Sequence, residues 1–506
     1  FSAQAAVQPS AAEEYVPKAR LILRLQDDAT VQPAAVSTAA PVDARLAAVL
    51  ADLHIDGVVF ERVLGGDILV ARMAPGTTAE QARAISELLN THPAIRYAEP
   101  DGRVRPAYVP ADPLRVGQWF QYEAYGVSAY DAWDVERGAA GVVMALLDSG
   151  IRTHEDLDAT RVLPGYDFVS NPAYANDGGG LDANPTDPGD GVAANECGAG
   201  EPAEDSSWHG LHLAGIMIAQ TDNNIGVAGL NHVSKLLPVR VLGKCGGSYA
   251  DIIAGILWAA GLPGSGAATL NPRPAHVINL SFAAEQACTA GIQDAIDRAV
   301  AAGAVVVAAA GNSNGLDVAN VLPAGCSNVI AVAATTRGGD IAGYSNVGSR
   351  VSLSAPGGDG IVPGDGILSL FNSGLTTPGA DDYAYFAGTS VAAAQVAAGV
   401  SLLISIQPGL TSSDVRTILR QSASAFPAGG CPAANCGAGI LNLDAAVRIA
   451  RSFTPSSAST GDGGGGGGGC VLRTGADGNA GAQDVVWLLV LLGVAALRRA
   501  GHGPMV

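Results

Sequence analysis

The sequence predicts an α/β fold with a parallel central sheet, preceded by a small α+β domain. Between residues 106 and 450, apolar runs rich in Val and Ala alternate with helical segments, as expected for a parallel sheet covered by helices on both faces. Residues 19–105 instead read as strand, helix, two strands, helix and strand. The 506 residues exceed the usual size of one domain, so two or three units are expected.

The α+β domain is expected to be ferredoxin-like, because its elements follow the β-α-β-β-α-β order. A Gly65–Gly66 pair marks the turn between the two middle strands. The expected strands cover 19–25, 57–64, 67–73 and 95–100, and the expected helices cover 42–53 and 78–90.

In the larger domain, β-branched and Ala-rich runs predict six strands, over 142–148, 235–242, 276–282, 304–310, 328–334 and 350–356. The segments 251–260 and 291–302, which lie between such runs, are expected to be helical.

The two ends of the chain differ in composition from these domains. Residues 1–18 are small and polar, and we expect them to be the remnant of a secretory leader. A Ser/Gly-rich linker covers 451–469. Residues 470–506 hold Cys470, an apolar run and paired arginines. That run is shorter than the roughly 20 residues that span a bilayer. This tail resembles bacterial surface-sorting signals, and a simple membrane anchor is the alternative.

Charge and cysteine content narrow the possible functions. The formal net charge of -19 argues against nucleic acid as a partner, because binding to phosphates needs clustered Lys and Arg. None of the seven cysteines has zinc-type CxxC spacing. Six cysteines in the larger domain suit an oxidising compartment, so we expect a secreted or cell-surface protein. We also expect the protein to be a monomer.

Three residues are candidates for catalysis, and each has a simpler reading when taken alone. Asp148 ends a buried strand before a Gly turn, where an Asp often caps or shapes the turn. His209 begins a small-residue helix, with His212 as a competitor, and their spacing is not that of a zinc protease. Ser390 lies on the first turn of an Ala-rich helix, where Ser is a common N-cap.

Taken together, the three residues have a clearer meaning. A serine nucleophile needs a base and a carboxylate that orients it, and here the order is Asp, His, Ser. The segments VVMALLDSGI, WHGLHLAGIMIA and AGTSVAAAQVAAGVSLLIS resemble the subtilase signatures D-[ST]-G, H-G-T-H-x-A-G and G-T-S-x-A-x-x-x-x-A. The resemblance covers about residues 112–449 and implies a subtilisin-like serine endopeptidase with a three-layer fold.

The resemblance also implies the other parts of the site. Asn312, in VVVAAAGNSNG, would offer its amide to the tetrahedral oxygen. Protein or peptide substrates would pair with the strand end at 281–283 and lie against a Gly-rich second wall. The substrate-binding residues implied in this way are Ser281, Phe282, Ala283, Gly247, Ala309 and Gly311. Small residues in the pocket wall favour broad specificity.

Three positions depart from the family pattern. Leu211 stands where Thr is usual, Ala283 where Gly is usual, and Gln395 where the usual segment after the serine has His. Added methyl groups beside a substrate strand could narrow the cleft. The three departures leave open an alternative function, that of a catalytically impaired binding protein at the cell surface. A third reading, an esterase, is weaker because no GxSxG elbow surrounds Ser390.

The resemblance extends to maturation and to structural elements. Residues 19–105 resemble the inhibitory propeptide of the family, so we expect a zymogen that is cut within 102–112. AQTDNNIGVAGL resembles a calcium loop, and the ligands it implies for a structural calcium are Asp156, Asp222, Ile225 and Val227. Similarity to disulfide-bearing subtilases of Gram-negative bacteria, in which GKCGG is typical, favours the pairs Cys197–Cys245, Cys288–Cys326 and Cys431–Cys436 among 15 possible pairings.

Overall fold

The computed structural model describes residues 20–26, 42–65, 67–102, 108–362 and 364–456. The chain divides into two compact units after Pro106, compared with the predicted boundary after residue 105. The expected leader and C-terminal tail, including Cys470, lie outside the described residues.

The N-terminal unit is a four-stranded antiparallel sheet with two helices, in the strand order β2-β3-β1-β4. Residues of β1 alternate between buried and half-buried, as expected when one face of a sheet is covered. A capping box at Thr78 and Gln81 begins α2, which packs on β4 and β1. The elements are β1 (Arg20–Leu25), α1 (Val42–Asp52), β2 (Val59–Leu64), β3 (Ile68–Arg72), α2 (Ala79–Asn90) and β4 (Ile95–Pro100). The predicted β-α-β-β-α-β order is confirmed.

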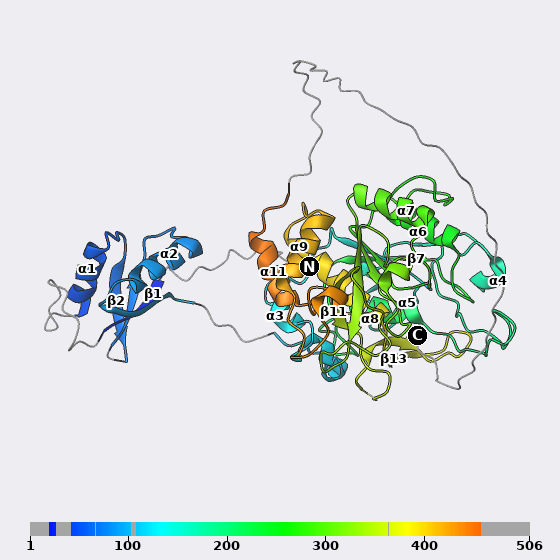
Figure 1. The fold of residues 1–506 in the computed structure, drawn as a ribbon, viewed down its shortest axis with the longest axis horizontal. Helices are drawn as coiled ribbons and strands as arrows, with labels where there is room; N and C mark the ends of the chain where they lie inside the picture. The colour runs from blue at the N-terminus through cyan, green and yellow to red at the C-terminus, as the bar shows by residue number, and fades with distance from the viewer. Residues whose placement is uncertain (1–19, 27–41, 66, 103–107, 363, 457–506) are drawn as a thin grey trace, which may run out of the picture. The chain divides into compact units, whose positions relative to one another are not determined.

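The second unit is built on a seven-stranded parallel sheet in the order β11-β10-β9-β8-β5-β7-β6, with a separate β12–β13 hairpin. Its strands are β5 (Val143–Asp148), β6 (Tyr166–Asp167), β7 (Lys235–Arg240), β8 (Val277–Leu280), β9 (Val305–Ala309), β10 (Val329–Thr335), β11 (Val351–Pro356), β12 (Ile367–Asn372) and β13 (Asp381–Phe386). Its helices are α3 (Ala129–Trp133), α4 (Pro172–Ala175), α5 (His209–Ile218), α6 (Tyr249–Ala259), α7 (Ala290–Ala301), α8 (Thr389–Ile406), α9 (Ser412–Ser422), α10 (Ala433–Cys436) and α11 (Leu443–Ser452). Figure 1 shows the helices around the sheet.

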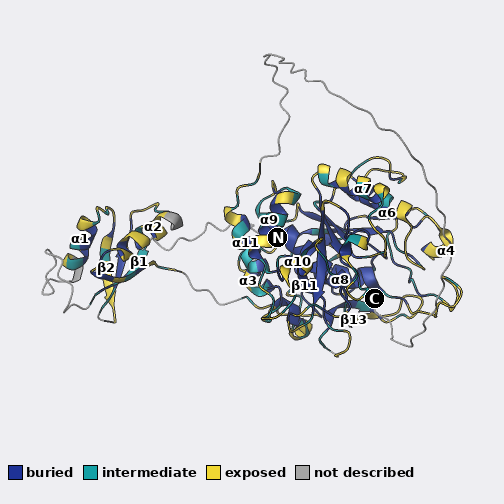
Figure 2. Ribbon diagram, in the orientation of Figure 1, coloured by how far each residue is buried: buried dark blue, intermediate teal, exposed yellow. Residues whose placement is uncertain are grey.

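Alternating side chains of the strands enter two separate apolar cores. In β5, Met144 and Leu146 pack with α5 and α8, whereas Ala145 and Leu147 pack with α6 and α7. The sheet is therefore the middle layer of three, and the predicted three-layer α/β architecture is confirmed. Helix α8 has the length and hydropathy of a membrane span, but 89% of that window is buried in the protein, as Figure 2 shows for the core helices. It is a core helix.

The strand order of the sheet changes direction at β5. Strands β7 and β6 lie on one side of β5, and β8, β9, β10 and β11 follow on the other. The carboxyl end of a strand at such a switch point is where open α/β sheets bind ligands. Asp148 is the last residue of β5, so the fold places it at this edge.

The six predicted strands of this unit are present. The sequence patterns missed β6, the β12–β13 hairpin and the C-terminal helices α9 and α11. The hairpin strand β13 is largely exposed, with the sequence DDYAYF, so it lacks the apolar run that identified the other strands. The three predicted disulfides are present, as Cys197–Cys245, Cys288–Cys326 and Cys431–Cys436.

Candidate active site

Asp148 is held rigidly at the end of β5. The residue is completely buried, and its backbone oxygen accepts hydrogen bonds from the N–H groups of Val241 and Leu242. Its Oδ1 accepts from the backbone N–H of Ser149 at 2.8 Å and from Nδ1 of His209 at 2.8 Å. The carboxylate therefore fixes both the orientation of the imidazole and the nitrogen that carries its proton.

His209 is the first residue of α5 and is 7% exposed. Two neighbours fix its position. Trp208 adopts a left-handed backbone conformation and donates its indole N–H to the oxygen of Gly374 at 2.7 Å. Gly210 lies so close to Gly150 that a Cβ at position 210 would collide with the Gly150 carbonyl, which explains the need for glycine after the histidine.

The electrostatic surroundings of His209 favour its charged form. Burial alone acts to lower the pKa of the imidazole, but the negative charge of Asp148 and the hydrogen bond to it outweigh burial. The carboxylates of Asp190 and Asp187 act in the same direction, so the pKa is raised overall. A base that becomes a stabilised cation when it takes a proton is what acyl transfer requires.

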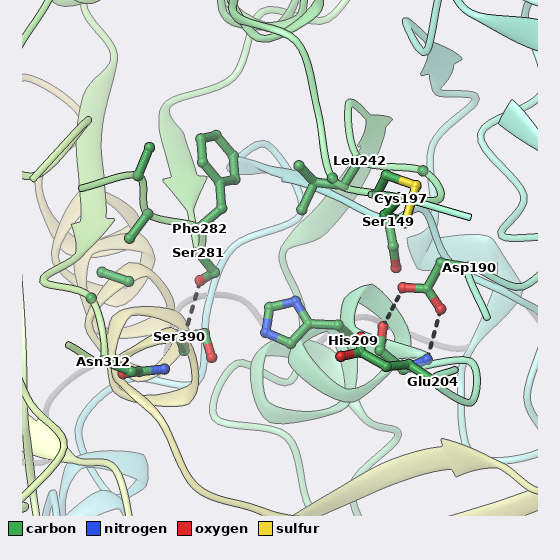
Figure 3. A pocket seen from close by; sticks show the side chains of 18 of the residues that line it. Ser149, Asp190, Cys197, Glu204, His209, Leu242, Ser281, Phe282, Asn312 and Ser390 are labelled. Carbon is green, nitrogen blue, oxygen red and sulfur yellow. Dashed lines mark hydrogen bonds between the residues drawn. A yellow bond between two sulfur atoms is a disulfide. The ribbon is translucent and has the colours of Figure 1, made fainter. Parts of the chain in front are cut away.

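Ser390 lies at the start of α8, 6% exposed, in a cleft of about 580 Å³ that His209 also lines. Its backbone oxygen accepts from Oγ of Ser281 at 3.0 Å, and that hydroxyl accepts from Asn279 at 2.7 Å, so the end of β8 is tied to the start of α8. Figure 3 shows the imidazole of His209 turned toward Ser390 across the cleft. The structure thus brings together the three predicted catalytic residues.

Asn312 is oriented by the residue before the serine. Its Oδ1 accepts from the backbone N–H of Thr389 at 3.0 Å and from Oγ1 of Thr389 at 2.9 Å. Oγ1 of Thr389 in turn accepts from the N–H of Gly311 at 2.9 Å. The amide oxygen therefore faces α8, and Figure 3 shows the amide nitrogen on the side of Ser390. The backbone N–H of Ser390 lies in the first turn of α8, where helices leave such donors without partners in the helix.

Two further residues support the site and were missed by sequence reasoning. Oγ of Ser149 donates to Oδ2 of Asp187 at 2.8 Å and accepts from the N–H of Gly210 at 3.1 Å. Asp187, fully buried, thereby connects the turn after Asp148 to the start of α5. The Ser149 position stood in the D-S-G motif, but nothing in the sequence indicated that a carboxylate 38 residues later would meet it.

The predicted substrate residues lie mostly where they were expected. Ser281, Phe282, Ala283, Ala309 and Gly311 line the cleft, and the hydrogen-bonded base of α8 forms its floor. Gly247 does not line it. A Cβ there would collide with the oxygen of Val241, so this glycine serves a close backbone approach, and the neighbouring Gly246 faces the cleft instead.

Of the three positions that depart from the family pattern, only Ala283 lines the cleft. Leu211 is completely buried in the core around α5 and α8, so the expected narrowing of the cleft by this side chain is wrong. Gln395 is also buried and donates to the oxygen of Pro356 at 2.6 Å. The competitor His212 contacts the oxygen of Ala384, stacks on Phe386, and has a pKa lowered to about 3 by burial. It is a neutral structural residue.

The two carboxylates predicted to bind calcium, those of Asp156 and Asp222, are engaged by hydrogen-bond donors instead. Both oxygens of Asp156 accept from N–H groups: Oδ1 from Asn223 at 2.7 Å and Oδ2 from the backbone of Val227 at 2.9 Å. Asp222 turns elsewhere, because its carboxylate accepts from Tyr108 and from the backbone of Ala111. Calcium requires six to eight converging oxygens, whereas here N–H dipoles point at the carboxylate. Among the described residues there is no cluster of three or more acidic, His or Cys side chains suited to a metal.

Removing calcium with a chelator tests whether the loop at Asp156 and Asp222 binds this ion. We expect EGTA to change the Tm of the full-length protein by less than about 2 °C, because ligand stabilisation requires a site that binds the folded state. Thermal unfolding followed by circular dichroism measures it, with Asp156→Asn and Asp222→Asn as matched variants. A calcium-dependent rise of several degrees that Asp156→Asn abolishes would show that the loop binds calcium after all.

Comparison with known proteins identifies one family over most of this unit. The sequence profile described as the subtilase family matches residues 139–445. An extracellular protease of Xanthomonas campestris pv. campestris is 46% identical over 73% of this chain and 62% of its own length. An extracellular basic protease of Dichelobacter nodosus is 39% identical over 73% of this chain and 61% of its own. The chain thus spans about three-fifths of these relatives.

A relative of known structure and a shorter relative are also proteases similar to this chain. A protease structure from Pseudoalteromonas arctica PAMC 21717 is 46% identical, with a TM-score of 0.65, and covers 68% of this chain and 100% of its own. Thermitase of Thermoactinomyces vulgaris is 32% identical over 92% of its length.

Proposed function

Because this chain belongs to the subtilase family, we propose that it is a secreted serine endopeptidase that cleaves peptide bonds with Asp148, His209 and Ser390. The observation that carries the proposal is the 2.8 Å contact between Asp148 and His209 at the edge of the cleft that also contains Ser390. The binding-protein alternative is less favoured, since Leu211 and Gln395, two of the three departures behind it, are buried away from the cleft.

The steps of peptide hydrolysis follow from the position of the proton on His209. Nδ1–H of His209 donates to Asp148, so Nε2 is the basic nitrogen and takes the proton of the Ser390 hydroxyl as Oγ attacks the carbonyl carbon. The resulting imidazolium faces the buried carboxylate. The imidazolium then gives its proton to the amine, the amine departs, and an acyl-enzyme remains. A water molecule, deprotonated by the same nitrogen, releases the acid and restores the hydroxyl.

Negative charge on the tetrahedral oxygen would be met by two donors. These are the side-chain amide of Asn312, held in place by Thr389, and the backbone N–H of Ser390 at the start of α8. The positive end of the α8 dipole acts in the same direction.

Replacing Asn312 with Leu tests this assignment. We expect kcat to fall about 10²–10³-fold with little change in KM, because the donor acts on the transition state more than on the bound substrate. Steady-state kinetics on a peptide substrate measures both constants. Asn320→Leu, a change at an exposed residue that follows the same loop and does not line the cleft, is the control. An unchanged kcat in Asn312→Leu would remove this residue from the oxyanion site.

A fluorophosphonate probe tests the function itself. Such a probe reacts only with an activated serine, so we expect one adduct, located at Ser390 by peptide mass analysis of the processed protein. Ser390→Ala and His209→Ala should show none. Intact protein that binds peptides but gives no adduct would favour the binding-protein alternative.

Maturation and location are part of the proposal. The N-terminal unit has its own apolar core, which suits a domain that acts as the enzyme's inhibitor until it is cut off. The names of the relatives place them outside the cell, and the three disulfides suit that compartment. Attachment through the C-terminal tail and a monomeric state stay predictions from the sequence.

A further inference from the structure

Negative charge is concentrated around the cleft. Four carboxylates line the cleft, those of Asp190, Glu201, Glu204 and Glu285, and no Lys or Arg is among its described lining residues. No ion pair or side-chain hydrogen bond within the described part of the chain engages Glu201, Glu204 or Glu285. Asp190 accepts two hydrogen bonds from Ser207 and forms no ion pair with a Lys or Arg of the described residues. The nearby Lys244 pairs with Glu196, which does not line the cleft, so the four lining carboxylates present net negative charge to whatever enters it.

The segment that supplies three of these carboxylates is fixed in place. Backbone hydrogen bonds join Val192 and Glu204 in both directions, at 2.9 and 3.0 Å, and close a hairpin. The Cys197–Cys245 disulfide ties the tip of this hairpin to the loop that follows β7. We call residues 190–207 the acidic wall. Figure 3 shows Asp190 and Glu204 beside His209, on the side of the cleft that holds this disulfide.

The acidic wall is part of the surface that substrate must contact. Its cross-link partner Cys245, together with Gly246 and Leu242, lines the cleft, as does the 281–284 segment. Substrate extended between these two segments, as the proposed function requires, would pass within reach of the wall's side chains. Fixed charges in a cleft raise the local concentration of opposite charge and penalise like charge.

The chain's own sequence offers a substrate of matching charge. The segment joining the two units, residues 101–112, reads DGRVRPAYVPAD. Between Asp101 and Tyr108 its charged side chains are Arg103 and Arg105. It is also the segment within which removal of the N-terminal unit is predicted.

We propose that the acidic wall makes this cleft selective for peptides with Lys or Arg among the residues preceding the scissile bond, the joining segment with Arg103 and Arg105 being its first substrate. The inference rests on the proposed function and adds to it a substrate class. It replaces the broad apolar specificity expected from the sequence.

Internally quenched peptides test the selectivity. The mature enzyme would be given peptides that place Lys, norleucine or Glu at each of the four positions before the cut. We expect kcat/KM for Lys to exceed that for Glu by about tenfold or more at one position at least, with norleucine between them. The ratio should shrink between about 0.02 M and about 0.5 M salt, because screening shortens the reach of exposed charges.

Substitutions in the acidic wall test whether its carboxylates cause the preference for Lys over Glu. Glu201→Gln with Glu204→Gln should reduce the Lys-to-Glu ratio to within about twofold of unity, and Glu204→Lys should favour Glu peptides. Asp294→Asn, an exposed carboxylate on α7 outside the cleft, removes one charge and should leave the ratio unchanged. A peptide covering residues 99–112 should be cut faster than its Arg103→Gln, Arg105→Gln form.

The outcomes separate the two proposals. Equal rates for Lys and Glu peptides, or a ratio that the double Gln variant leaves intact, would overturn the selectivity. The enzyme proposal would then still stand, because fluorophosphonate labelling at Ser390 reports catalysis whatever the preferred sequence. The three substituted side chains, those of Glu201, Glu204 and Asp294, are exposed, and an unchanged Tm would show that the variants are folded.

Discussion

Full-length protein carrying Ser390→Ala is expected to lose about 10⁶-fold in kcat and to accumulate as an uncut chain. Without Oγ no acyl-enzyme can form, and the remaining rate would come from water activated by His209 beside the oxyanion donors. The methyl group of alanine fits the space of the hydroxymethyl group, so the cleft itself should be preserved. The loss is therefore chemical rather than structural.

Expression in a protease-free host, followed by mass analysis of the chain and peptide kinetics, measures both effects. Ser405→Ala is the control, because this serine lies near the far end of the same helix and bonds only to a backbone oxygen of α8. If mature-length protein were obtained from Ser390→Ala, another enzyme would be doing the cutting. Residual turnover within about tenfold of the wild type would remove Ser390 from the role of nucleophile.

The core of the fold and the grouping of the three residues proposed for catalysis were predictable because both rest on local patterns. Buried parallel strands need continuous apolar runs, and these are legible in a sequence whatever their neighbours. The catalytic residues occupy short motifs in which glycine is required by close packing, as Gly210 is against Gly150. Such requirements leave a local signature.

The parts that escaped prediction depend on contacts between distant segments. Asp187, which accepts from Ser149, and the acidic wall lie in a long, largely irregular stretch between β6 and α5, where no periodicity indicates which residues meet. Leu211 illustrates the same limit, since its position in a motif suggested the cleft while its helix face points it into the core. The donors at the Asp156 carboxylate were also not predictable, because a sequence does not show whether a loop turns an N–H or a C=O toward a given point.

Asp148→Asn is expected to lower kcat about 10⁴-fold while leaving the fold in place. The Asn side chain has the same shape, but its NH2 group would face Nδ1 of His209 as a donor. The imidazole would then carry its proton on Nε2, the nitrogen that must accept the proton of Ser390. The imidazolium formed during the reaction would also lose its partner, whose Oδ1 lies 2.8 Å away in the wild type.

The same variant should move the acid limb of the pH profile. The charge of Asp148 raises the pKa of His209, so removing it lowers that pKa. Activity needs neutral imidazole and falls as the pH drops below the pKa, so the acid limb of the residual kcat/KM should shift to lower pH. Asp190→Asn is the matched control: it removes a negative charge that also raises this pKa but does not contact the imidazole. It should therefore shift the limb slightly downward with no loss near 10⁴-fold. An Asp148→Asn variant that keeps both its rate and its pH profile would mean that this carboxylate does not orient the base.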